Sequence, residues 1–212
     1  MFLSKPAAHR SEKRQAGDSS PIPAKLAENQ VKLEPVIHKL TSAEETFLRA
    51  ADRISASNWP ERPDPERWSA GHVVAHLCLV ERGVLAYADR VIQRQPKALP
   101  FYRRLHLPLA LVEARVMKRK APRMVAPEEN HASKEVMIAE LSGVRERTRA
   151  FLEETHGREL SEYYWRHPVL GHLNFYDWFA FVAAHQLRHS KQMWEIGQNL
   201  PKDVASSQKQ KG

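Results

Sequence analysis

The stretch NFYDWFAFVAAHQLRHSKQMWEIG, residues 174–197, decides the fold because it has the pattern of a long helix buried along much of its circumference. Asn174 stands where an N-cap belongs, and Asp177 follows at the third helical position, a combination that satisfies free N–H groups in a first turn. Within the apolar residues that follow, His185 and His189 share one face with other polar side chains. Polar side chains inside such a helix need partners. The stretch therefore predicts a helix of a packed α-helical domain that also carries a site.

Three further stretches have apolar residues at helical spacing. We expect these helices to begin at the capping box Thr41–Glu44, at Ser69 and at Ser133. The proline-rich residues 59–65, the pair Gln95-Pro96 and the pair His156-Gly157 end them. A long connection with a short helix around residues 109–120 joins the second helix to the third. The sequence predicts an all-α fold, a four-helix bundle with this long connection between helices 2 and 3.

The two ends of the chain differ in composition from the part between them. Residues 1–34 are polar, mixed in charge and interrupted by prolines, so they cannot bury enough apolar area to offset the entropy of ordering. Residues 199–212 have the same character. We therefore expect flexible tails over 1–34 and 199–212 and one helical domain over 35–198.

The composition also limits where the protein works. Cys78 is the single cysteine, which excludes an internal disulfide framework and fits a reducing compartment; we expect its thiol to be buried and inert. The first residues lack the apolar core of a secretory signal, and the apolar run 178–184 is too short to span a membrane. We expect a soluble, cytoplasmic protein without a membrane span.

The formal net charge of +8 is concentrated in residues 90–123, which hold many arginines and lysines. Such a charge run usually marks a solvated surface. Binding of an anion, of nucleic acid or of membrane headgroups through this segment is the alternative, with nucleic acid the less favoured partner.

The pair His185 and His189 is the strongest signal for chemistry. Residues four apart on a helix lie one turn apart on the same face, and neutral imidazoles suit zinc, nickel, copper or iron. A third ligand has to come from another helix, and His76 lies on the apolar face of the second one. His72 ranks below it because a first helical turn is usually open to water. The alternative is that these histidines serve packing.

Two segments resemble the DinB-like (YfiT-like) superfamily. The first is WSAGHVVAHL, residues 68–77, followed by Val80-Glu81-Arg82; the second is HPVLGHLN, residues 167–174, followed by Trp178 and by AHQLRHSKQ, residues 184–192. The resemblance covers roughly residues 36–198. It implies an up-down-down-up four-helix bundle, often dimeric, with a three-histidine metal site that falls here on His76, His185 and His189.

The resemblance implies several activities without choosing among them. Family members include thiol-dependent transferases and isomerases and metal-dependent hydrolases. Three imidazoles leave at least one coordination position open for water or a thiolate. We therefore expect an enzyme that holds one divalent ion, most readily zinc or nickel, and acts on a small molecule. A low-molecular-weight thiol is a candidate second substrate, and a homodimer is the candidate assembly.

No general base is evident beside this site. Glu81 lies five residues beyond His76 and about 140° around the helix, and Asp177 has capping as its main role. The alternative to an enzyme is a non-catalytic, stress-associated or metal-sensing interaction protein, which a fourth protein ligand such as His72 would favour. The tryptophans near these segments, Trp68 among them, are expected to pack in the core or at its rim.

Overall fold

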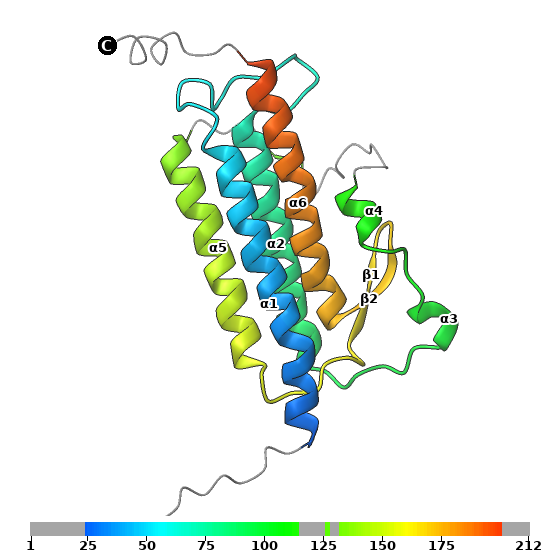
Figure 1. The fold of residues 1–212 in the computed structure, drawn as a ribbon. Helices are drawn as coiled ribbons and strands as arrows, with labels where there is room; N and C mark the ends of the chain where they lie inside the picture. Colours follow the sequence, from blue (N-terminus) through cyan, green and yellow to red (C-terminus); the bar gives the residue numbers. More distant parts are fainter. Residues whose placement is uncertain (1–23, 115–125, 128–131, 201–212) are drawn as a thin grey trace, which may run out of the picture.

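The computed structural model describes residues 24–114, 126–127 and 132–200. Four long helices lie side by side within this part of the chain (Figure 1): α1 (Ala24–Ala51), α2 (Ala70–Ile92), α5 (Lys134–Glu154) and α6 (Phe175–Asn199). Two short helices, α3 (Phe101–Arg104) and α4 (Ala110–Glu113), lie in the connection between α2 and α5. The described chain is mostly helical, which confirms the predicted all-α class.

Polar caps start three of the long helices where the sequence predicts them. Ser69 Oγ accepts a hydrogen bond from the His72 amide, and Asn174 Oδ1 accepts one from the Asp177 amide at 2.9 Å. Ser133 Oγ plays the same part at the start of α5. Each cap satisfies one of the free N–H groups of the first turn.

Helix α1 begins at Ala24, so the predicted start at Thr41 is wrong, and residues 24–34 are helical rather than part of a tail. Pro35 lies inside α1 on an exposed position. The buried residues Leu33, Val36 and Leu40 recur on the inner face, and their burial outweighs the hydrogen bond that proline cannot donate. Thr41 donates its hydroxyl to the Ile37 carbonyl, a bond made within a helix.

A two-stranded antiparallel hairpin, which the sequence did not predict, precedes α6. Strands β1 (Tyr164–His167) and β2 (Gly171–Asn174) pair from Tyr164 opposite Asn174 to His167 opposite Gly171. The predicted turn at residues 167–171 connects them. Gly171 has a φ of +98°, a conformation open to glycine at little cost. Strands of four residues are too short to show the alternation by which strands are recognised in a sequence.

A buried polar network joins all four long helices. Arg145 of α5 donates to both carboxylate oxygens of Glu81 on α2, at 2.8 and 3.0 Å, and to Gln186 Oε1 on α6, at 2.7 Å. Its remaining terminal nitrogen donates to the Leu40 carbonyl of α1. Because the network includes the neighbour of His185 and a residue five positions from His76, it fixes how α2 and α6 sit beside each other.

The remaining expectations concern the connection and the ends. Helix α4 covers only part of the short helix expected at 109–120, and residues 115–120 lie outside the described residues. Helix α6 ends at Asn199 and Leu200 is buried, while residues 201–212 of the predicted tail are not described. None of the described helices has the length and apolar character needed to cross a membrane.

Candidate metal centre

Three histidine side chains from two helices converge at one point of the fold. His185 and His189 lie one turn apart on α6, and His76 reaches them from α2. The Nε2 atom of His185 is 3.3 Å from that of His76 and 3.2 Å from that of His189. One ring nitrogen from each of the three residues lies within 4.8 Å of the other two. The structure thus brings together the three histidines that the sequence singles out.

The spacing of these nitrogens fits a single tetrahedral ion. A zinc–nitrogen bond of about 2.0–2.1 Å places two ligands of a tetrahedral ion roughly 3.3 Å apart. The two separations above have this value. His185 therefore lies at a distance from each of the other two rings that suits shared coordination of one divalent ion.

Gln192 holds the His189 ring in the orientation that a metal ligand needs. His189 Nδ1–H donates to Gln192 Oε1 at 2.9 Å. A proton on Nδ1 leaves the Nε2 lone pair of the neutral ring free to face His185. Hydrogen bonds of this kind to the second ring nitrogen fix the tautomer and raise the basicity of histidine ligands.

The environment also keeps the imidazole of His185 neutral. Burial, followed by the neighbouring rings of His189 and His76, holds the pKa of His185 well below its usual range. A protonated ring cannot bind a metal ion. At neutral pH the His185 ring, which lies between those of His76 and His189, is therefore uncharged.

Aromatic rings surround the three histidines. The Trp68 ring lies 4.9 Å from the His76 ring and stacks on that of His189 at 6.4 Å, centroid to centroid. Phe181 stacks on His185 at 5.4 Å from one turn earlier on α6. Trp68 thus lines the site. Its position in the sequence, just before the N-cap of α2, does not indicate this role. These rings shield part of the centre from water and strengthen electrostatic interactions within it.

His72 is not a fourth member of the cluster. Contrary to its expected exposure, the side chain is buried. Its Nδ1 lies 2.6 Å from Ser69 Oγ, and its Nε2 accepts from Arg62 at 3.0 Å. Among the described residues no further histidine, cysteine or carboxylate joins the three histidines. The arrangement is therefore that of an open site rather than one closed by four protein ligands.

The carboxylates nearest in sequence have other partners, and the nearby Cys78 thiol is buried. Glu81 pairs with Arg145 in the buried network, and Asp177 Oδ2 lies 3.3 Å from His106 Nε2. Burial raises the pKa of the Cys78 thiol to about 12, so the expectation of a buried, inert thiol is confirmed. None of these groups is placed as a general base or nucleophile at the three histidines.

His167, which lies between the predicted third and fourth helices, occupies a partly buried position. Its Nδ1 accepts hydrogen bonds from the Val169 and Leu170 amides, both at 3.1 Å. Its ring contacts Phe181 edge-on at 4.5 Å and lies near Trp178. Burial lowers the pKa of His167 to about 4.

We expect the free energy of unfolding to fall less in acid for His167→Asn than for the parent protein. The unfolded chain takes up a proton on His167 below pH 6.5, whereas the folded chain does so only near pH 4, so the free energy of unfolding falls as the pH falls through this window. Asparagine can accept the same backbone hydrogen bonds without titrating. Urea unfolding at neutral pH and near pH 4 measures the difference, with the exposed His38→Asn as the matched control. An unchanged pH dependence in His167→Asn would contradict the assignment.

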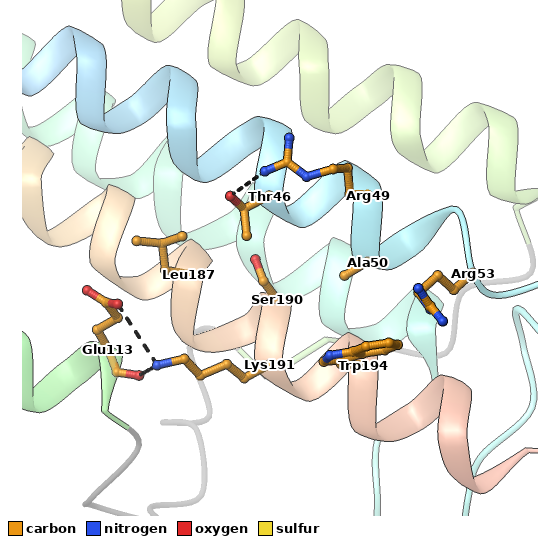
Figure 2. Close-up of a pocket in the computed structure, with 9 residues that line it drawn as sticks. All are labelled: Thr46, Arg49, Ala50, Arg53, Glu113, Leu187, Ser190, Lys191 and Trp194. Atoms are coloured by element: carbon orange, nitrogen blue, oxygen red, sulfur yellow. Dashed lines mark hydrogen bonds and ion pairs between the residues drawn. The ribbon is translucent and has the colours of Figure 1, made fainter.

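A separate groove of about 360 Å³ lies on another part of the surface (Figure 2). Side chains of α1 and α6 line it together with Arg53, just after α1, and Glu113 of α4. Lys191 donates to the Glu113 carbonyl at 2.9 Å, and the Arg53 guanidinium lies 3.8 Å from the centre of the Trp194 ring. The three histidines are not among the lining residues. We therefore place the candidate chemistry at the histidines and not in this groove.

Known proteins resemble this chain over most of its length. Residues 39–193 match the sequence profile of the DinB superfamily. The uncharacterized protein YuaE of Bacillus subtilis (strain 168) is 30% identical over 151 residues, which cover 69% of this chain and 88% of that protein. No solved structure gave a significant match.

Proposed function

Since the chain belongs to the DinB superfamily, we propose that it binds one divalent metal ion through His76, His185 and His189 and acts with it as an enzyme on a small molecule. The observation that carries this proposal is the convergence of the three Nε2 atoms at 3.2–3.3 Å around His185. The site also lacks a fourth protein ligand among the described residues. These features suit a catalytic centre better than a structural one.

The chemistry follows from the open position of such a site. A divalent ion held by three imidazoles would supply Lewis-acid activation of a water or thiol. The chain's own contribution is to keep the His185 imidazole neutral, to hold the His189 ring through Gln192 and to shield part of the site with Trp68 and Phe181. Hydrolysis or thiol-dependent transfer on a small molecule are the reactions that fit.

The finer parts of the proposal concern the ion, the partners and the assembly. Zinc or nickel is the ion we favour, because three imidazoles suit both. We also propose a low-molecular-weight thiol as co-substrate, a homodimeric assembly and a cytoplasmic location. We further propose that α1, α2, α5 and α6 form the up-down-down-up bundle typical of the family; their arrangement in Figure 1 supports this.

A non-catalytic metal-binding role is the alternative. It requires the coordination sphere to be closed by protein, and His72 was the candidate for this. Both ring nitrogens of His72 instead have partners in Ser69 and Arg62, which favours the enzyme.

Cobalt substitution tests whether the site has an accessible position. We expect the cobalt-loaded protein to change its visible spectrum when a small thiol or another exogenous ligand is added, since an open position accepts a donor. Substrate screens for hydrolysis and thiol transfer would then compare the loaded protein with His76→Ala. A cobalt spectrum that no exogenous ligand perturbs would exclude the catalytic proposal and leave the structural one.

We expect Gln192→Ala to lower the affinity for the metal by roughly 10- to 100-fold, the usual effect of removing a hydrogen-bond partner of a ligand. The substitution removes the hydrogen bond that orients the His189 ring and fixes its tautomer. Gln198→Ala, an exposed glutamine on the same helix, is the matched control and should bind as the parent does. Competition with a chromophoric chelator measures both affinities. Equal affinities in the two variants would contradict the role given to Gln192.

A further inference from the structure

The connection between α2 and α4 displays apolar side chains at an unusual level of exposure. Phe101, Tyr102, Leu105 and Leu107 are 78%, 68%, 67% and 43% exposed. They lie on and directly after α3, which stands beside the hairpin and away from the four long helices (Figure 1). Contiguous exposed apolar residues of this size usually mark a site of interaction. We name residues 97–107 the apolar-basic segment.

Three contacts hold the apolar-basic segment in place. The Leu107 amide donates to the Leu170 carbonyl at 3.2 Å, and Arg104 pairs with Glu162 at 3.0 Å. His106 Nε2 lies 3.3 Å from an Asp177 carboxylate oxygen. Because these contacts tether the backbone to the hairpin and to α6, the four apolar side chains are presented from a fixed support.

The charged residues of this stretch of the chain are all basic, although Glu162 and Asp177 lie beside Arg104 and His106. Residues 90–112 contain five arginines and lysines and no acidic residue. Of these, Arg94, Lys97 and Arg103 are exposed, and the Arg103 guanidinium lies 5.8 Å from the centre of the Tyr102 ring. The segment therefore combines exposed apolar side chains, which can insert into a bilayer, with exposed cationic side chains.

We propose that the apolar-basic segment docks the protein on the surface of an anionic lipid bilayer. Phenylalanine and leucine side chains enter the boundary between headgroups and acyl chains, tyrosine lies at headgroup level, and neighbouring cations contact anionic lipids. An anionic bilayer accounts for both the exposed apolar side chains and the cations of the segment. The proposal is independent of the metal centre.

Two other occupants fit the segment less well. A symmetric contact with a second copy of the chain would bring the same surface patch together from both subunits, and so would oppose Arg94, Lys97 and Arg103 to one another. A single-stranded nucleic acid would use the cations and stack bases on Phe101 and Tyr102. It would leave the two exposed leucines without a role.

Co-sedimentation of the full chain with vesicles tests this proposal. We expect binding to phosphatidylcholine vesicles that contain phosphatidylserine to be about tenfold or more tighter than binding to phosphatidylcholine alone, and to weaken with salt. Phe101→Ser with Leu105→Ser should lower the affinity about tenfold or more, because both lose their apolar insertion. Lys97→Glu with Arg103→Glu should remove the preference for phosphatidylserine.

The control for these variants is Val31→Ser with Val136→Ser, which changes two exposed apolar residues on α1 and α5. Its vesicle binding should equal that of the parent, and unfolding curves should show all variants folded. Three results would overturn the proposal. They are no binding of the parent chain to either vesicle, binding that survives the Phe101 and Leu105 substitutions, or binding of a single-stranded oligonucleotide in place of vesicles.

Discussion

Replacing Arg145 by methionine is expected to lower the free energy of unfolding by about 3–5 kcal/mol, the usual cost of breaking a buried ion pair by removing one partner. Arg145 is 1% exposed and Glu81 is 3% exposed, so Arg145→Met leaves a carboxylate buried without its guanidinium. It also removes the donors to Gln186 Oε1 and the Leu40 carbonyl. Urea unfolding monitored by circular dichroism measures the loss.

Arg147→Met is the matched control for this substitution. Arg147 is an exposed arginine on the same helix, and a surface substitution there should change stability by no more than about 0.5 kcal/mol. Adding Glu81→Gln to Arg145→Met should restore part of the loss, since it removes the unpaired charge. An Arg145→Met variant as stable as Arg147→Met would contradict the role of the network in joining the helices.

The second large effect concerns the metal ion. A ligand that binds only the folded chain stabilises it by about 4 kcal/mol when its free concentration is 1,000 times the dissociation constant. We therefore expect zinc or nickel at such an excess to raise the free energy of unfolding by about this amount. The ion joins α2 to α6 through His76 and the two histidines of α6, so the effect should appear as a rise in the unfolding midpoint.

His76→Ala provides the control for metal stabilisation. It removes the one ligand that α2 supplies and should abolish most of the rise, while the apo variant stays folded. Cys78→Ser changes another buried residue of α2 and should keep the full metal effect. Equal stabilisation of the parent and His76→Ala would place the ion elsewhere on the chain.

Local signals in the sequence predicted the parts of the fold that depend on neighbours along the chain. The caps at Ser69, Ser133 and Asn174 lie where their side chains and the following apolar pattern place them. The spacing of His185 and His189 put both rings on one face of α6. The choice of His76 over His72 rested on the apolar face of α2, and the structure groups His76 with the other two.

The features that the sequence did not predict depend on contacts between distant residues. Pro35 looked like the end of a tail, whereas packing of Leu33 and Val36 extends α1 across it. Burial of His167 results from its contacts with Phe181 and Trp178, which no local pattern records.

The same limit applies to the surroundings of the site. Trp68 contacts His189, which is 121 residues further along the chain, and Arg145 reaches three other helices. A single sequence carries no signal for pairings of this kind, so neither the aromatic wall nor the buried network was predicted.

The metal content of the purified protein, determined by elemental analysis beside a His185→Ala, His189→Ala double variant, tests the central claim most directly. We predict about one divalent ion per chain in the parent protein after supplementation with zinc or nickel, since three imidazoles form one site, and none in the variant. No ion in the parent, or the same content in both proteins, would contradict the claim and would mean that the three histidines serve packing.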